Sequence, residues 1–93
     1  MSDQPEPRTF VICNRRGLHA RSSAKFVKCV AEFDAVVQVR RDGQEVSGAS
    51  IMGLLMLGAA KGSTIEVQAG GPQAAAVLDA LQALIEGGFD EEC

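Results

Sequence analysis

The chain contains no tryptophan or tyrosine and only four phenylalanines among its 93 residues. Aromatic side chains that could stack on unpaired bases are therefore almost absent. The formal net charge is −3 and the sequence pI is about 5.0, whereas domains that bind nucleic acid usually carry a strong basic surplus. This composition excludes nucleic acid as the expected partner.

Long apolar runs are also missing. The longest, Ile51–Ala60, is interrupted by Gly53 and Gly58, and a membrane-spanning helix needs about 20 apolar residues. Residues Met1–Pro7 are polar and lack the apolar segment of a secretory signal. The three cysteines form an odd set without metal-ligand spacing. We therefore expect a cytoplasmic domain with no membrane insertion and no bound metal.

Positive charge is concentrated in the first half of the chain. Eight of the nine Lys and Arg residues lie between residues 8 and 41, where only Glu32 and Asp34 oppose them. From Asp42 onward, Lys61 is the only cation. A basic region on an acidic chain predicts an anionic partner or substrate.

The hydrophobic pattern predicts one α+β domain, since 93 residues can enclose only one core. The strand and helix patterns follow the order βαββαβα, and an antiparallel sheet covered by helices on one face would bury their apolar sides. We expect a disordered tail over residues 1–7, the domain over 8–88 and an acidic tail over 89–93. Strands are predicted over 8–13, 35–40, 44–47 and 64–69, and helices over 19–33, 50–57 and 72–86.

The first predicted helix has apolar residues at helical spacing. These are Ala20, Ala24, Val27 and Ala31, and the wider face adds Phe26, Val30 and Phe33. We expect this face to pack on the sheet.

His19 is the only histidine, and it lies where the loop Asn14–Gly17 meets the first helix. Free N–H groups and the positive end of the helix dipole favour phosphate at such a junction. Imidazole is a nucleophile near neutral pH, and the guanidinium of Arg21 can bind phosphate oxygens. These features predict a phosphohistidine whose phosphate cradle is formed by Ala20, Arg21 and Ser22. The residues alone leave open that His19 is an ordinary surface or capping residue.

Two motifs carry a resemblance to a known family. Gly17-Leu18-His19-Ala20-Arg21, followed by Ala24-Lys25-Phe26-Val27, resembles the active-site signature of HPr, the phosphocarrier protein of the bacterial phosphoenolpyruvate-dependent phosphotransferase system. The second signature of that family resembles Ser50-Ile51-Met52-Gly53-Leu54 with the following Leu57-Gly58 and Ala60-Lys61-Gly62. The resemblance spans about residues 8–88. It implies an HPr-like open-faced β-sandwich with a four-stranded antiparallel sheet of order 1-4-2-3.

The resemblance also implies the chemistry. His19 would accept a phosphoryl group from enzyme I and pass it to an enzyme IIA protein, and Arg21 would stabilise the phosphohistidine. The chain would be a protein co-substrate and not an autonomous enzyme. It would bind no cofactor, because phosphoenolpyruvate and Mg²⁺ are used by enzyme I. We expect a monomer, since a carrier must expose its docking face.

One position departs from the family pattern. Ser22 stands where many members have proline. Proline would stiffen the first helical turn, whereas serine can satisfy N–H groups there. The substitution resembles nitrogen-type members, often called NPr, and favours that regulatory branch over sugar uptake.

The second motif predicts a docking surface. Its short helix carries more apolar side chains than it can bury, which indicates an exposed patch. By resemblance the docking residues are Ile51, Met52 and Leu55, whereas Leu54 and Leu57 are the predicted core residues. Arg16 and Lys25 are expected to attract an acidic partner.

Ser50 is predicted to cap this short helix. The resemblance adds a regulatory hypothesis, because an HPr kinase phosphorylates the matching serine in some bacteria. An alternative function follows from these two sites. The chain could be a regulatory binding module that is switched by phosphorylation of His19 or Ser50, with no obligatory onward transfer.

Overall fold

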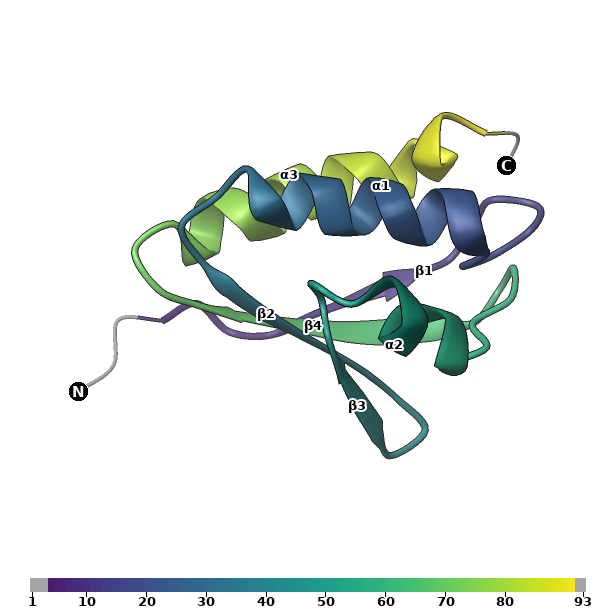
Figure 1. The fold of residues 1–93 in the computed structure, drawn as a ribbon, viewed down its shortest axis with the longest axis horizontal. Helices are drawn as coiled ribbons and strands as arrows, with labels where there is room; N and C mark the ends of the chain where they lie inside the picture. Colours follow the sequence, from purple (N-terminus) through teal and green to yellow (C-terminus); the bar gives the residue numbers. More distant parts are fainter. Residues whose placement is uncertain (1–3, 92–93) are drawn as a thin grey trace.

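A computed structural model describes residues 4–91 of the chain (Figure 1). The order of its main elements is βαββαβα, as predicted, followed by a single 3-10 turn. The strands are β1 (Arg8–Val11), β2 (Val36–Arg41), β3 (Gln44–Ser47) and β4 (Thr64–Gly70). The helices are α1 (Ala20–Ala31), α2 (Ile51–Met56), α3 (Ala74–Glu86) and the 3-10 turn η1 (Gly88–Asp90).

The four strands form one antiparallel sheet of order β1-β4-β2-β3. This confirms the fold class that the family resemblance implied. The register places apolar residues opposite one another on the covered face, where Phe10 pairs with Ile65 and Val39 with Val67. Both pairs are buried. Because side chains alternate along a strand, this register turns one whole face of the sheet toward the helices.

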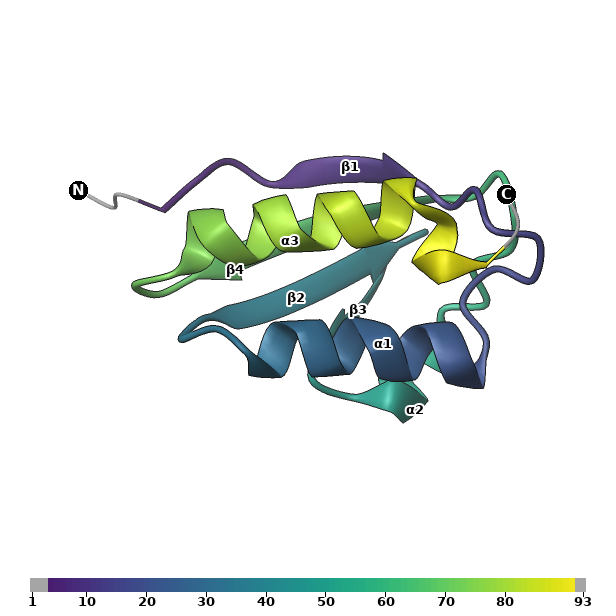
Figure 2. The same ribbon diagram turned by 90° about the horizontal axis from the view of Figure 1, so that it is seen from above.

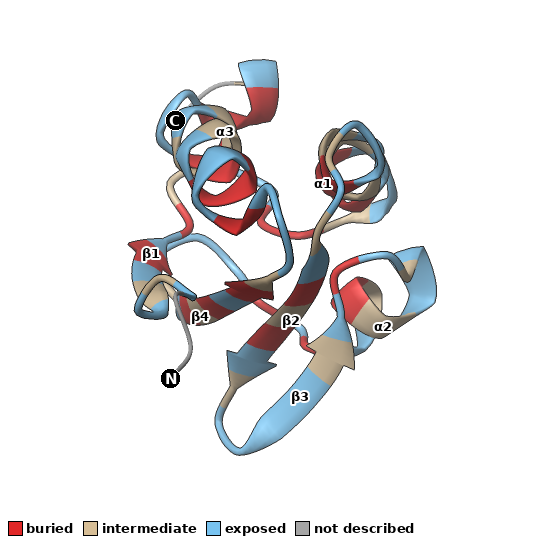
Figure 3. Ribbon diagram, turned by 90° about the vertical axis from the view of Figure 1, so that its left-hand side faces the viewer, coloured by how far each residue is buried: buried red, intermediate tan, exposed pale blue. Residues whose placement is uncertain are grey.

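Helices α1 and α3 lie side by side over one face of the sheet, and α2 lies next to α1 beside β3 (Figures 2 and 3). The core forms between these layers. Helix α3 contributes the buried side chains of Val77, Leu78, Leu81 and Ile85. None of the helices that the structure describes combines the length and apolar character that a membrane crossing requires.

The buried face of α1 agrees only in part with the predicted one: Phe26 and Val30 of the wider predicted face are buried, but the predicted alanines are not. Ala20, Ala24 and Ala31 are exposed, whereas Phe26 and Val30 are buried together with Ser22 and Ser23. The larger side chains bury more apolar surface, and they set the rotation of the helix. The small alanines are left on its exposed side.

The packed domain extends beyond the predicted boundary at residue 88. Phe89 is fully buried in the core. It is reached by a turn in which Phe89 and Asp90 both adopt left-handed backbone angles, with φ of 55° and 62°. Burial of a phenylalanine side chain outweighs the cost of that conformation. Residues 1–3 and 92–93 of the two predicted tails lie outside the described residues.

Candidate functional site

The loop before α1 is fixed against the segment that follows α2. Gly17 has φ of 66°, and a Cβ atom there would overlap the carbonyl oxygen of Ala59. The next residue, Leu18, is buried and donates its N–H to that same oxygen at 2.8 Å. Only glycine permits this close approach. The approach places His19 at the first turn of α1 instead of in a mobile loop.

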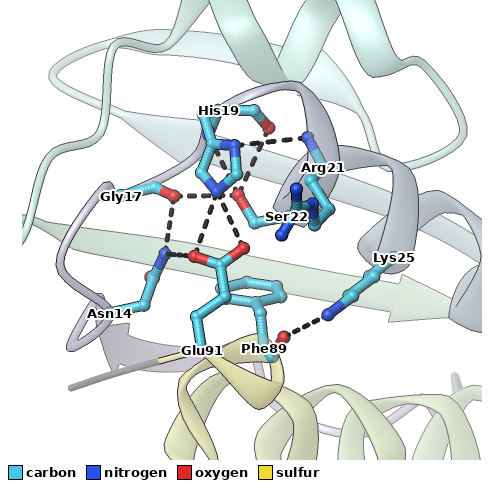
Figure 4. Close-up of polar contacts among 8 residues, drawn as sticks. All are labelled: Asn14, Gly17, His19, Arg21, Ser22, Lys25, Phe89 and Glu91. Atoms are coloured by element: carbon cyan, nitrogen blue, oxygen red, sulfur yellow. Dashed lines mark hydrogen bonds and ion pairs between the residues drawn. The ribbon is translucent and has the colours of Figure 1, made fainter.

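His19 is the N-cap of α1, with the extended backbone that a cap requires. Its Nδ1 atom accepts a hydrogen bond from the N–H of Arg21 at 3.3 Å (Figure 4). A ring nitrogen that accepts a hydrogen bond carries no proton, so its lone pair faces the N-terminus of the helix. The predicted junction of imidazole, helix start and Arg21 is therefore present, with Ala20 as the first helical residue.

Ser22 fixes the backbone around this histidine. Its Oγ atom accepts the N–H of His19 at 2.9 Å and donates to the carbonyl oxygen of Gly17 at 2.8 Å. The residue is fully buried. These two hydrogen bonds hold the first turn of α1 in place of the ring constraint that proline would supply.

The other ring nitrogen of His19 contacts a residue that sequence reasoning missed. Nε2 lies 2.8 Å and 3.0 Å from the two carboxylate oxygens of Glu91 (Figure 4). Asn14, fully buried, donates from Nδ2 to Glu91 at 3.1 Å and to the carbonyl oxygen of Gly17 at 2.8 Å. Asn14 lies in the polar loop directly before the His19 motif, so the sequence offered a reason to consider it as a site residue. The sequence offered no such reason for Glu91, because the turn at Phe89 and Asp90 brings it to the site.

The carboxyl group of Glu91 is ionised at neutral pH. Burial acts to raise its pKa, but hydrogen bonds from Asn14 and His19 and the nearby positive charge of Lys25 outweigh that effect. The pKa of Glu91 is therefore below its ordinary value. A charged carboxylate accepts hydrogen bonds only, so Nε2 of His19 is the donor in this contact.

A basic pocket of about 350 Å³ opens beside the histidine and is lined by Arg15, Arg16, Arg21, Asp90 and Glu91. Of the cations predicted to attract a partner, Arg16 is exposed. Lys25 is half-buried, and its Nζ atom donates to the carbonyl oxygen of Phe89 at 2.6 Å. Lys25 thus holds the C-terminal turn in addition to contributing charge.

The short helix α2 has one buried side and one exposed side. Met52 is 68% exposed and Ile51 is 39% exposed, whereas Leu55 is half-buried. Met56 is 67% exposed and extends the apolar patch beyond the predicted residues. Leu54 and Leu57 are buried, which confirms them as core residues.

The Oγ atom of Ser50 accepts the N–H of Gly53 at 2.9 Å. The predicted N-cap of α2 is confirmed. Among residues 4–91, no cluster of three or more His, Cys, Asp or Glu side chains is placed to hold a metal ion.

The open-faced sandwich with a histidine at a helix N-terminus defines a class of small phosphoryl-carrying proteins, and comparisons with known proteins identify the family. The family model described as "PTS HPr component phosphorylation site" matches residues 7–87. A phosphocarrier protein NPr of Shewanella violacea is 43% identical over 84 residues, which cover 90% of this chain and 92% of that protein. A phosphocarrier protein HPr of Neisseria meningitidis is 46% identical over 80 residues, with 86% and 90% coverage.

The fold comparison agrees. The crystal structure of HPr-C-His from Thermoanaerobacter tengcongensis matches with a TM-score of 0.90 and 36% identity, covering 96% of this chain and 100% of that one. The chain belongs to the HPr family of the phosphotransferase system. Its function is that of a phosphoryl carrier, and the alternative of a binding module without onward transfer is not favoured.

Proposed function

We propose that His19 accepts the phosphoryl group on Nδ1 from phosphorylated enzyme I and transfers it to an enzyme IIA protein. The orientation of the imidazole supports this assignment, since Nδ1 faces the N–H of Arg21 at the start of α1. A phosphoryl group bound to Nδ1 would meet the N–H groups and dipole of that helix terminus. The guanidinium of Arg21 would add a charge-assisted contact.

The transfer conserves atoms and electrons without a separate base. The lone pair of Nδ1 attacks the phosphorus atom of the donor phosphohistidine, and the nitrogen–phosphorus bond of the donor breaks. The bonding electron pair leaves with the donor nitrogen. Onward transfer reverses these roles, with Nδ1 of His19 as the leaving nitrogen. The in-line geometry requires both proteins, so this chain is a co-substrate and not an autonomous enzyme.

The docking surface that suits this reaction is the apolar patch formed by Ile51, Met52, Leu55 and Met56 on α2. Exposed methionine adapts to several partner surfaces, which a carrier with a donor and an acceptor needs. Arg16, on the rim of the basic pocket, would attract acidic partners and increase the association rate. Phosphoenolpyruvate and Mg²⁺ enter the pathway at enzyme I.

The proposal is tested by mass spectrometry of the intact chain after incubation with enzyme I, phosphoenolpyruvate and Mg²⁺. We expect one acid-labile phosphoryl increment on the parent chain and none on a folded His19→Ala variant. Addition of an enzyme IIA protein should then remove the increment. A sugar-type and a nitrogen-type acceptor, tested in parallel, distinguish the two branches. A phosphoryl group that forms equally on the variant would overturn the role of His19.

We also propose Ser50 as a regulatory phosphorylation site for an HPr kinase. A phosphate on this N-cap would place negative charge beside the apolar patch on α2, where it would oppose docking of an acidic partner. Ser50→Asp mimics the charge and retains a capping oxygen. We expect this variant to unfold like the parent and to accept phosphoryl groups from enzyme I more slowly. An unchanged transfer rate would argue against regulation at this position.

A further inference from the structure

The carboxylate of Glu91 contacts the nitrogen of His19 that does not receive the phosphoryl group in the proposed reaction. Nε2 lies 2.8 Å from one Glu91 oxygen and 3.0 Å from the other, and Nδ1 is on the opposite side of the ring, facing Arg21 (Figure 4). Glu91 lies beyond residue 87, the last residue matched by the family model. The family resemblance therefore assigns no role to this residue.

Residues from several parts of the chain hold the Glu91 carboxylate against His19. Phe89 is buried in the core, and its carbonyl oxygen accepts from Lys25 at 2.6 Å. Asn14 donates to the Glu91 carboxylate at 3.1 Å. The Glu91 side chain is only 13% exposed, and that of His19 is 22% exposed. These contacts hold the carboxylate in one place, unlike a salt bridge between two flexible surface side chains.

The two neighbours of the imidazole impose the same protonation state. The backbone N–H of Arg21 is a donor and requires an acceptor at Nδ1. The ionised carboxylate is an acceptor and requires a donor at Nε2. The ring nitrogen that keeps its proton is determined by the hydrogen bond at each position. Together these contacts leave the lone pair on Nδ1, where the proposed nucleophile must have it.

We infer that Glu91 is a positioning residue for phosphoryl transfer: it holds the proton on Nε2, fixes the ring, and stabilises the positive charge that the imidazole acquires as Nδ1 bonds to phosphorus. This inference rests on the proposed role of His19 Nδ1. The Nε2 proton stays on the ring throughout, so no co-reactant is needed. In the same way, a carboxylate that accepts a hydrogen bond from one ring nitrogen of a catalytic histidine orients the imidazole and sets which nitrogen carries the proton.

The opposite hypothesis is that the C-terminal turn blocks the site, because Glu91 brings negative charge close to an incoming phosphoryl group. The geometry favours positioning over blocking. The carboxylate contacts Nε2, whereas Nδ1 accepts its hydrogen bond from the N–H of Arg21. If Glu91 blocks the site, removing its carboxylate should speed phosphoryl transfer. If Glu91 positions the ring, removing the carboxylate should slow transfer.

The test combines proton and nitrogen NMR of the unphosphorylated chain with the rate of phosphoryl acceptance from phosphorylated enzyme I. In the parent we expect a downfield Nε2–H proton resonance that is protected from solvent exchange. In Glu91→Ala this resonance should be lost, and acceptance should slow by roughly tenfold, the size of one charge-assisted hydrogen bond. Glu91→Gln keeps the shape of the side chain without its charge, and its rate of phosphoryl acceptance should lie between those of the parent and Glu91→Ala.

Glu86→Gln is the matched control, because it neutralises an exposed carboxylate at the end of α3 whose hydrogen bond comes from Gln82 and not from His19. It should retain both the resonance and the parent rate. Equal or faster acceptance by Glu91→Ala, or an unprotected Nε2–H in the parent, would overturn the inference. Failure of the proposed function has a different signature, since the parent itself would then accept no phosphoryl group while the NMR result still reports on the Glu91 contact.

Discussion

Ser22 and Ser23 are adjacent serines in α1, both fully buried, but their hydroxyl groups have opposite environments. Ser22 Oγ bonds to His19 N–H and to the Gly17 carbonyl oxygen. Ser23 Oγ is buried without a hydrogen-bond partner. A buried hydroxyl contributes to stability only when it is paired. The two serines therefore form a matched pair for testing how the site is held.

Ser22→Ala should lower the free energy of unfolding by about 1–3 kcal/mol, because it removes the two hydrogen bonds that Ser22 Oγ makes to the His19 N–H and to the Gly17 carbonyl oxygen. Ser23→Ala should change it by less than about 0.5 kcal/mol or increase it, since alanine favours the helix and removes an unpaired group. Urea unfolding of both variants checks the prediction. Equal losses would show that the Ser22 hydrogen bonds do not stabilise the first turn.

Glu91 should give the protein a specific sensitivity to acid. Burial acts to raise its pKa, but hydrogen bonds from Asn14 and His19 and the positive charge of Lys25 hold that pKa below its ordinary value in the folded state. The stabilising contribution is present above the ordinary carboxyl pKa of 4.5 and is lost as the pH falls through the lower folded-state pKa. Between these pH values, the stability of the parent should fall more steeply than that of Glu91→Gln. Urea unfolding between neutral pH and pH 3 measures the slopes, and parallel curves would contradict the contact.

Some residues of the site could be predicted from the sequence and others could not. His19 and Arg21 were identified because a short signature places them at a loop-to-helix junction. The capping role of Ser50 followed from local propensity. Glu91 could not be predicted, because its position depends on two left-handed residues and on burial of Phe89, and neither is encoded by a local pattern. Lys25 was predicted as a surface charge, and its contact with Phe89 depends on the same turn.

One face of helix α2 packs in the core, and the opposite face is exposed for docking. Leu54 is buried in the core and Met52 is exposed, only two positions away. Leu54→Ala should cost about 2–5 kcal/mol of stability because it leaves a cavity. Met52→Ala should leave the unfolding free energy within about 0.5 kcal/mol and slow phosphoryl transfer from enzyme I, since it removes docking surface. Thermal unfolding and transfer kinetics on both variants test this separation; a Met52→Ala variant with the parent transfer rate would contradict the docking role.

Periodicity predicted the elements more completely than it predicted the buried face of α1. Strand β3 has the predicted bounds, and β4 begins at the predicted residue. Strand β1 ends at Val11 instead of residue 13, although Ile12 still donates to Ser63 at 2.8 Å. In α1 the predicted Phe26 and Val30 are buried, whereas the alanines at helical spacing are exposed. Larger side chains decide which side is buried, and their partners lie on distant strands.

At the scale of the whole molecule, the C-terminal turn belongs to the domain. Phe89→Ala should lower the free energy of unfolding by about 3–5 kcal/mol, because the side chain is fully buried. Val11→Ala, at a position 57% exposed, is the control and should have a small effect. Chemical denaturation distinguishes the two variants. Parent-like stability of Phe89→Ala would restore the predicted boundary at residue 88.

The sheet order is a property of the whole molecule that local patterns did not determine. Local patterns predict four strands, and Asp42-Gly43 is a dipeptide typical of the hairpin turn that joins β2 to β3, which do pair. Placement of β4 between β1 and β2 requires contacts between residues far apart in the chain. That order came from the family resemblance. The same long-range pairing positions the loop before α1 against Ala59, and therefore His19 at its helix.

The most direct test of the account is phosphorus NMR of the chain after phosphorylation by enzyme I and phosphoenolpyruvate. The chemical shift distinguishes a phosphoryl group on Nδ1 of histidine from one on Nε2. The account predicts a single phosphohistidine resonance of the Nδ1 type that is absent from His19→Ala. A resonance of the Nε2 type, or a phosphoryl group on another residue, would contradict it.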